Sequence, residues 1–298
     1  MRFGIMAMQV DRLVPAGLSL QQVLGHLLSF DHAALVRGLA EPGFNPIELG
    51  GDLSLFLPPA FSPDAVGRLA ALKSELGLSY TVHLPLWSVE PSTPQEPVRL
   101  GSVQALVDCI RAVRPLEPEV FVLHATGALA AEFYQMRLPD TAKALILRQF
   151  QNGAEESVKS IPAQTGLPSR MLAIETVEFP FEMTLELAEK LDTSICFDTG
   201  HVLVGFSGPV DFFAALEQIL PRLAEVHLHD GPWQGPERKI GYGKDHSPLG
   251  TGDLEVGRLL DRLSAAHFRG PLVFELQVSQ AITSLDLIRR LRPHALEN

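Results

Sequence analysis

The chain has few cysteines and no long apolar run. Only two of its 298 residues are cysteines, Cys109 and Cys196. They lie far apart inside apolar segments, so they indicate reduced core residues and exclude a disulfide framework. No apolar run approaches the roughly 20 residues that span a bilayer, which excludes a transmembrane helix. The opening residues also lack the features of a secretory signal, so we expect a cytoplasmic protein.

Positive charge is also scarce. The chain has 24 Lys and Arg residues against 35 Asp and Glu residues, which gives a formal net charge of −11. Phosphate backbones select basic surfaces, so this balance disfavours a nucleic-acid partner. We therefore expect a small-molecule substrate. The sequence leaves open whether the chain forms a homo-oligomer.

What the chain does contain is a regular alternation of two kinds of segment. Eight short runs are rich in Val, Ile, Leu and Phe, which is typical of strands buried on both faces. Helical stretches lie between them; in the clearest, Ser62 can cap the first turn and Gly77 can end the helix. The predicted strands are 2–8, 46–51, 79–86, 119–125, 171–177, 193–200, 224–230 and 271–277. The other predicted helices are roughly 19–39, 101–114, 140–161, 182–191, 210–221, 254–267 and 280–291.

This alternation predicts the fold class. A strand followed by a helix, eight times over about 250–300 residues, favours an α/β protein with a closed (β/α)₈ TIM barrel. No linker or low-complexity segment divides the chain, so we predict one domain over residues 1–298. A doubly wound open sheet is the competing architecture. However, no Gly-rich dinucleotide turn follows the first strand.

Carboxylates and imidazoles stand at the ends of most predicted strands. In a TIM barrel these ends face one common mouth, where active sites are built. Several carboxylates at close range repel one another and are costly to bury unpaired, so we expect a divalent cation among them. Imidazole together with carboxylate suits Zn²⁺, Mn²⁺, Fe²⁺ or Co²⁺ better than Ca²⁺. The predicted ligands are Glu175, Asp198, His227 and Glu275.

Other residues near these strand ends are candidates for binding a substrate. Tryptophans at the mouth can stack on a ligand, and a lysine there can bind a phosphate. Each also has a structural interpretation, since a rim aromatic is often plain packing and a lone glutamate is often salt-bridged. His124 and His229, taken singly, are more typical of hydrogen-bonded structural histidines. The substrate-binding candidates are Glu48, Trp87, Trp233 and Lys244.

Five segments, in this order, resemble the xylose-isomerase-like TIM-barrel superfamily, also known as AP endonuclease family 2. They are "LAIETV", "CFDTGH", "VHLHD", "KDHSPLGTGDLE" and "VFELQ". The resemblance covers nearly the whole chain from "IELGGD" onward. The superfamily includes sugar-phosphate isomerases and epimerases, inosose dehydratases and the endonuclease IV type of apurinic-site nuclease. Its members share a metal site but differ in chemistry, so the reaction stays open.

The isomerase and epimerase branch implies one divalent metal, Zn²⁺, Mn²⁺, Co²⁺ or Mg²⁺, held by the four predicted ligands. Glu175 and Glu275 would also move protons at carbons next to a carbonyl that the metal polarises. His201 would bind a substrate hydroxyl. Ketose 3-epimerases of this branch carry an Arg where this chain has Trp233. We predict this branch first, as an enzyme that isomerises or epimerises a sugar or sugar phosphate.

The endonuclease IV branch implies three zinc ions and hydrolysis of a phosphodiester by water that the metal activates. The four predicted ligands would hold one ion, and Glu175 would be shared with a second. A third ion would lie on the loop after the seventh strand. The additional ligands in this interpretation are His83, His124, His201, Asp245 and His246.

The chain departs from the nuclease pattern on that loop. The pattern has Asp, one residue, then His, whereas here Lys244 holds the Asp position and Asp245 directly precedes His246. This counts against a complete third set, and the acidic charge counts against DNA. Cobamide-remodelling phosphodiesterases are similar around "YTVHLPL" and "DHSPLG", so a small phosphodiester such as a cobamide is the alternative substrate. A non-catalytic metal- or ligand-binding barrel is the third hypothesis.

Overall fold

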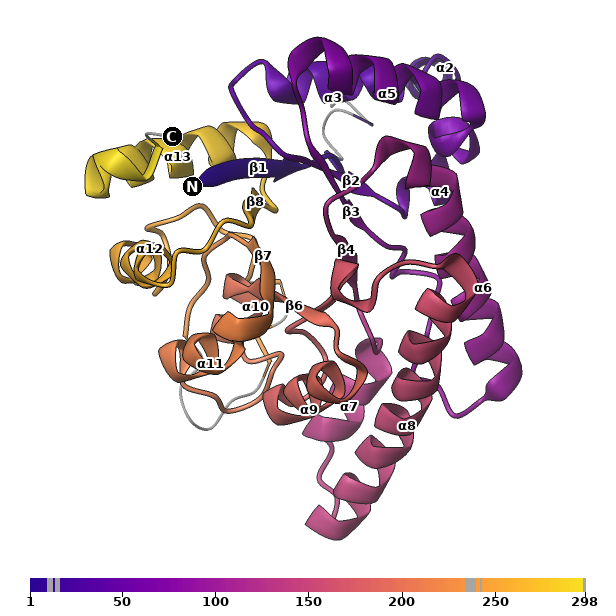
Figure 1. Ribbon diagram of the computed structural model, residues 1–298, viewed down its shortest axis with the longest axis vertical. Coiled ribbons are helices and arrows are strands. Elements are labelled where there is room, and N and C mark those ends of the chain that lie inside the picture. Colours follow the sequence, from indigo (N-terminus) through magenta and orange to yellow (C-terminus); the bar gives the residue numbers. More distant parts are fainter. Residues whose placement is uncertain (10–12, 14–16, 234–239, 242, 297–298) are drawn as a thin grey trace.

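The computed structural model describes residues 1–9, 13, 17–233, 240–241 and 243–296. Eight parallel strands close into a barrel in sequence order, and β8 pairs with β1 (Figure 1). The prediction of a TIM barrel is confirmed. The strands are β1 (Arg2–Met6), β2 (Ile47–Gly50), β3 (Tyr80–His83), β4 (Phe121–Leu123), β5 (Leu172–Glu175), β6 (Ser194–Asp198), β7 (Leu223–His227) and β8 (Pro271–Phe274).

Helices surround the barrel, as the ribbon in Figure 1 shows. Within the described residues, no helix is long and apolar enough to cross a membrane. The α-helices are α2 (Leu20–Leu28), α3 (His32–Ala40), α4 (Leu53–Phe56), α5 (Pro63–Leu76), α6 (Glu96–Val113), α7 (Ala128–Gln135), α8 (Asp140–Thr165), α9 (Phe181–Leu191), α10 (Thr199–Val204), α11 (Phe212–Ile219), α12 (Val256–Ala265) and α13 (Val278–Leu291). Short 3₁₀ turns are η1 (Pro58–Phe61), η2 (Arg114–Leu116), η3 (Ser169–Met171), η4 (Leu220–Arg222) and η5 (Pro293–Leu296).

The predicted elements are present, although some bounds differ by up to five residues and the helices α4, α7 and α10 were not predicted. Two of the differences have a clear physical cause. Each strand is shorter than its apolar run, because strand pairing stops at the barrel rim while the apolar sequence continues into the loop. The helix predicted over 19–39 is divided into α2 and α3. Asp31 begins the second helix by accepting the backbone N–H of Ala33 at 3.0 Å, so its side chain competes with a continuous helix.

Helix α5 shows how the sequence attaches a helix to the barrel. Ser62 accepts the backbone N–H of Ala65 at 3.3 Å, and Gly77 ends the helix in the left-handed conformation, φ 63°. Leu69 is fully buried on the inner face. Its backbone oxygen accepts the hydroxyl of Tyr80, on β3, at 2.9 Å. The caps set the ends of the helix, and the buried face fixes its orientation on the barrel.

Strands β1 and β2 approach closely at Gly4, and this generates a prediction. A Cβ at Gly4 would lie 2.4 Å from the backbone oxygen of Pro46, whereas a Cβ at Gly67, on the exposed face of α5, would meet nothing within 4 Å. We expect Gly4→Ala to lower the free energy of unfolding by about 1–3 kcal/mol, because backbone must shift. Gly67→Ala should raise it by up to about 1 kcal/mol through helix propensity.

Urea denaturation followed by circular dichroism measures both changes. A Gly4→Ala variant as stable as the unmodified protein would contradict the close strand approach. The Gly67→Ala variant is the matched control for adding a methyl group where there is space.

Candidate metal centre

The carboxyl ends of β3 to β8, together with the loop after β7, bring carboxylates and imidazoles to one end of the barrel. Parallel strands place all their last residues at the same rim, which is why side chains far apart in sequence meet. Six of them line a cavity of about 600 Å³. These six are His83, His124, Glu175, His201, His246 and Glu275.

The structure brings the four predicted ligands together, with the three carboxylates placed around His227. The Nδ1 atom of this imidazole is buried and makes no hydrogen bond with the described residues. It lies 3.4 Å from an oxygen of Glu275 and 3.6 Å from oxygens of Glu175 and Asp198. Ligands about 2.05 Å from a tetrahedral Zn²⁺ are roughly 3.3 Å apart, so these spacings fit a shared cation better than hydrogen bonds.

A second set of donors adjoins the first through Glu175. The Nε2 atoms of His83 and His124 lie 3.1 and 3.0 Å from the same oxygen, Glu175 Oε2. His83 is oriented by its other ring nitrogen, Nδ1, which is 2.9 Å from the backbone oxygen of Leu84. A ring held in this way presents Nε2 as a ligand atom when the imidazole is neutral.

A third set joins His201, on α10, to the loop after β7, where the spacing differs from the nuclease pattern. Asp245 Oδ2 is 3.2 Å from His201 Nε2 and 3.1 Å from His246 Nδ1. The backbone of His246 is in the left-handed region, φ 54°, and the adjacent Asp245 reaches both histidines. Although Asp245 directly precedes His246, where the nuclease pattern has one residue between Asp and His, the set still contains a carboxylate. Lys244 is exposed and does not line the cavity.

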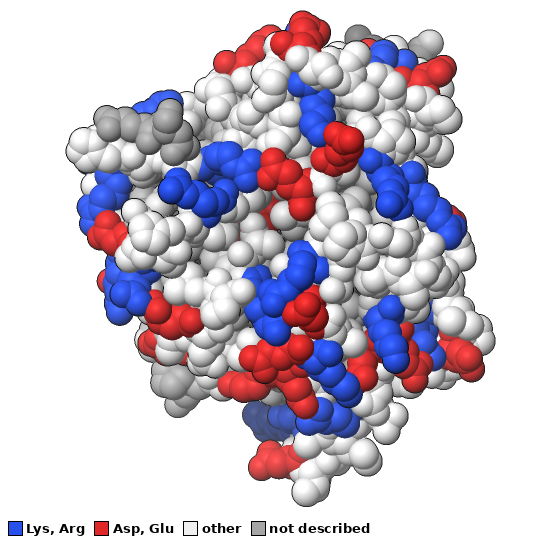
Figure 2. All heavy atoms as spheres, in the orientation of Figure 1, with Lys and Arg blue, Asp and Glu red and all other residues white. Residues whose placement is uncertain are grey.

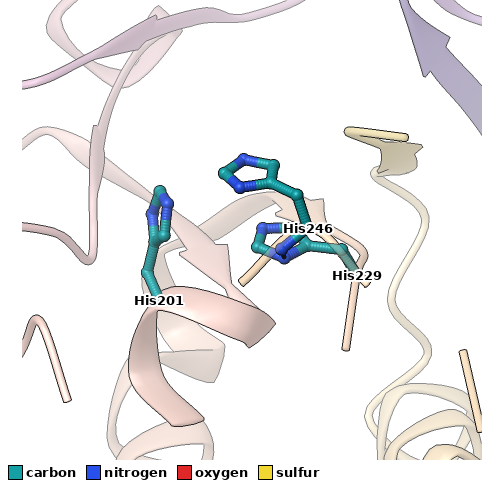
Figure 3. Close-up of side chains that lie close together, drawn as sticks. All are labelled: His201, His229 and His246. Atoms are coloured by element: carbon teal, nitrogen blue, oxygen red, sulfur yellow. Dashed lines mark hydrogen bonds between the residues drawn. The ribbon is translucent and has the colours of Figure 1, made fainter. Parts of the chain in front are cut away.

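His229 supports the site and was missed as a site residue in the sequence. Its ring nitrogens lie near those of His201 and His246 (Figure 3). However, Nδ1 accepts the backbone N–H of His246 at 2.9 Å, and Nε2 donates to Asp198 Oδ2 at 2.8 Å. This pattern fixes the neutral Nε2–H tautomer and uses both nitrogens. His229 therefore orients Asp198 and the backbone of His246 instead of binding a metal itself.

Gly200 makes room for the His229 ring. A Cβ at Gly200 would lie 2.1 Å from Nδ1 of that ring. The glycine of "CFDTGH" is therefore required by the second histidine of "VHLHD". The two motifs are distant in sequence, so this contact becomes visible only in the structure.

Asp230 anchors the loop that carries Asp245 and His246. Its buried carboxylate accepts four backbone N–H groups, at 2.8 to 3.0 Å. Its backbone also pairs with Ser247 in an antiparallel bridge. These bonds hold the loop to the end of β7, so Asp230 is a structural residue of the site. The donors are Gly231, Gly250, Gly252 and Leu254.

Glu48 lies beneath His227 and does not line the cavity. It is fully buried, with Oε1 3.3 Å from His227 Nε2. Thr81 Oγ1 lies 3.0 Å from oxygens of both Glu48 and Glu225. Burial, and then the charge of Glu48, raise the pKa of Glu225 well above its ordinary value, so that one of the two carboxyls keeps its proton. Glu48, predicted to contact substrate, instead contacts His227, one of the four predicted ligands.

The two tryptophans differ in position. Trp87 lines the cavity and is 56% exposed, with its ring edge-on to Phe56 at 5.8 Å. Trp233 is also exposed, and its backbone N–H donates to Asp253 at 2.8 Å, but it does not line the cavity. Of the two predicted stacking residues, the structure places only Trp87 where it can touch a bound molecule.

Imidazoles and carboxylates shift one another's pKa values strongly. Burial acts to raise the pKa of Glu275, but the charge of His227 and a hydrogen bond from His246 bring it to about 2. Burial acts to lower the pKa of His124 and His246, but Glu175 and Asp245, respectively, raise each to about 10. The protein groups alone therefore favour protonated histidines beside ionised carboxylates. A cation must displace protons to bind here.

Imidazole and carboxylate side chains gathered at the carboxyl ends of parallel barrel strands are typical of TIM-barrel proteins that bind a metal ion. The chain belongs to the xylose isomerase-like TIM barrel family, which it matches over residues 36–292. The resemblance drawn from the five sequence segments is confirmed.

Individual proteins are similar to this chain at low sequence identity. Uncharacterized protein MJ1311 of Methanocaldococcus jannaschii is 23% identical over 257 residues, covering 84% of this chain and 81% of that protein. The structure of a D-tagatose 3-epimerase-like protein has a TM-score of 0.70 at 20% identity, covering 100% of this chain and 99% of the other. Endonuclease IV from Thermus thermophilus has a TM-score of 0.64 at 19% identity, covering 88% of this chain and 94% of the other. The likeness to these solved structures concerns the fold.

The raised histidine pKa values predict pH-dependent metal binding. Zn²⁺ must displace protons from histidines whose pKa reaches about 10 at His124 and His246. Affinity should therefore rise as pH rises toward that value, by about tenfold per pH unit for each displaced proton. Isothermal titration calorimetry in buffers of different ionisation enthalpy measures the protons released. An affinity for Zn²⁺ that is constant between about pH 6 and pH 8.5 would contradict this coupling.

The contact between Gly200 and His229 predicts a loss of metal affinity in Gly200→Ala. The added methyl displaces the ring that orients Asp198, and losing such a supporting hydrogen bond typically costs about 10- to 100-fold in affinity. Competition with a chromophoric chelator measures the Zn²⁺ dissociation constant. Gly101→Ala, on an exposed turn of α6 with nothing within 4 Å of the new methyl, is the control. Equal affinity in the two variants would refute the role of His229.

Proposed function

We propose that this protein is a divalent-metal-dependent enzyme that hydrolyses a small phosphodiester. The observation that supports this most is the joining of three donor sets through shared carboxylates. Glu175 contacts His83 and His124 through one oxygen, and its other oxygen is 3.0 Å from His201 Nδ1. Glu275 faces His227 through Oε1 and His246 through Oε2. A site for a single cation needs only the four central ligands.

The donor chemistry fits Zn²⁺ or Mn²⁺, with Co²⁺ and Mg²⁺ as further candidates. When bound, such cations polarise a phosphoryl oxygen and lower the pKa of water. In the hydrolysis, water adds to phosphorus, the P–O bond to one ester group breaks, and the released oxygen takes a proton. The protein groups contribute ionised carboxylates, because neighbouring histidines hold Glu175 and Glu275 below their ordinary pKa despite burial.

The size of the site and the charge of the surface support a small substrate. The cavity is about 600 Å³, which is in the range of sites for single small molecules. On the face shown in Figure 2, basic and acidic side chains lie beside one another in several places, with uncharged surface between them. A duplex nucleic acid would instead need a continuous basic surface.

A sugar isomerase or epimerase, which the sequence predicted first, is the second candidate. The observation in its favour is that Glu175 and Glu275 both face His227 Nδ1, at 3.6 and 3.4 Å, as two proton-moving carboxylates beside one cation would. In this candidate His83, His124 and His246 would bind substrate hydroxyls. The phosphodiesterase accounts for more of the donors, because it gives those histidines a metal-binding role.

Metal content and activity distinguish the two candidates. We expect two or three Zn²⁺ ions per chain and turnover of bis-p-nitrophenyl phosphate. His124→Asn should lose one ion, and Glu275→Gln should lower kcat by about 100-fold or more, since removing one charge-stabilising group often costs that much. Glu182→Gln, on the exposed face of α9, is the control for loss of a carboxylate.

One ion per chain, with solvent deuterium entering a ketose and no phosphodiester turnover, would instead support the isomerase. Metal binding without either activity, across both substrate classes, would support a non-catalytic binding barrel.

A further inference from the structure

The cavity has two unlike sides. All of its imidazole and carboxylate metal donors come from strands β3 to β8 and their loops. The apolar residues come from β1, which neighbours β8 in the closed barrel, and from the segments after β1, β3 and β8. The apolar side is made of Met6, Met8, Leu86, Trp87 and Leu276, which we call the apolar wall.

Two glycines extend the apolar wall with their backbone, because they have no side chain. Gly50 and Gly51 line the cavity between β1 and the segment after β3. A Cβ at Gly50 would lie 3.1 Å from the terminal methyl of Met8, and one at Gly51 would lie 2.6 Å from Pro85 Cδ. The methionine therefore packs directly on the glycine backbone. This leaves a largely apolar surface on this side of the cavity.

The polar residue at the foot of this wall is fully occupied by the protein itself. Gln9 Nε2 donates to the backbone oxygens of Met6 and Leu276, at 2.8 and 3.0 Å. Its Oε1 accepts the backbone N–H of Val278 at 3.3 Å. An amide group in this state has no hydrogen left for a ligand. Gln9 therefore shapes the wall without making it polar.

Three further polar side chains lie on this side of the cavity. Asp52 accepts the backbone N–H of Leu86 at 2.8 Å and lies 3.4 Å from that of Trp87. At the start of α13, the side-chain oxygen of Gln280 accepts the backbone N–H of Gln277 at 3.2 Å, so these two glutamines form a polar edge beside the apolar wall. The side chains of the wall itself offer only the indole N–H of Trp87 and two weakly accepting thioethers, so a polyhydroxylated group packed on them would lose water and regain few hydrogen bonds.

Trp87 has the geometry of a stacking platform. Asp52 holds its backbone, and Phe56 contacts its ring edge-on, with ring centroids 5.8 Å apart and planes at 74°. Both rings are more than half exposed, at 56% and 58%. Burying these faces against a planar group would be favourable, and a methionine thioether adapts readily to an aromatic partner.

We infer that the ester group which hydrolysis leaves on phosphorus is planar and apolar, an aryl or heteroaromatic group, and that it packs against Trp87, Met6 and Met8. The phosphodiester then lies at the donors on the opposite side of the cavity. This inference rests on the proposed phosphodiesterase function and names the class of phosphodiester. Diesters with two small alkyl or sugar groups are poor substrates.

Two substrates with the same leaving group test the inference on the Zn²⁺-loaded protein. Bis-p-nitrophenyl phosphate and methyl p-nitrophenyl phosphate both release p-nitrophenol and differ only in the ester group that is retained. Trp87→Ala should lower kcat/KM for the bis-aryl substrate by about tenfold or more and for the methyl substrate by less than about twofold. Because each substrate is compared between two proteins, intrinsic reactivity cancels. Leu145→Ala, on an exposed face of α8, should change neither substrate.

A binding measurement tests the same contact without turnover. The chain has two tryptophans, so in a Trp233→Phe variant only Trp87 fluoresces. Diphenyl phosphate should change this emission saturably, at a concentration about tenfold or more below that required of dimethyl phosphate.

The outcomes separate the inference from the proposed function. Equal loss for both p-nitrophenyl substrates in Trp87→Ala, or equal binding of the two fluorescence probes, would overturn the apolar-group inference and leave the phosphodiesterase standing. Selective binding of diphenyl phosphate without hydrolysis of either substrate would support the apolar wall and overturn the proposed function.

Discussion

The site depends on one constraint, which is that several buried carboxylates face one buried imidazole. His227 has no exposed surface, and three carboxylates from three other strand ends lie within 3.6 Å of its Nδ1. Charges this close and this buried are costly unless opposite charges balance them. Positive charge can come either from protons on the histidines or from divalent cations. The other polar residues of the rim hold the groups that provide this charge balance.

Strand β7 places charged and polar side chains at successive levels along the barrel axis. Alternate residues of a strand point to the same face, so Glu225, His227 and His229 all face the barrel interior at successive levels. Glu225 shares the lowest level with Glu48, His227 stands among the ligands, and His229 orients Asp198 at the rim. The next residue, Asp230, turns outward and fastens the loop. One short strand thus supplies a ligand and the groups that hold the other ligands in place.

The sequence predicted the fold, and it predicted that Glu175, Asp198, His227 and Glu275 lie together, because both depend on local pattern. Apolar runs reveal buried strands, and polar residues at their ends must meet at the rim of a closed barrel. The loop after β7 was not predictable in the same way, since counting residues cannot show that His246 adopts a left-handed conformation beside Asp245. Glu225 was overlooked because it lies inside an apparently ordinary strand. The position of Trp233, which does not line the cavity, likewise depends on a loop.

The reaction is decided by what surrounds the four central donors, because those four are compatible with either proposed chemistry. The outer histidines are tied to the same carboxylates as the inner one, through Glu175 on one side and Glu275 on the other. A cation on either outer set would therefore change the charge balance at His227 as well. Coupling of this kind is suited to a dianionic transition state at phosphorus, where charge builds up on several oxygens at once. Proton transfer beside a carbonyl needs charge stabilised at one oxygen, which the central donors alone provide. The outer histidines are thus the part of the site that favours the proposed phosphodiester hydrolysis over proton transfer.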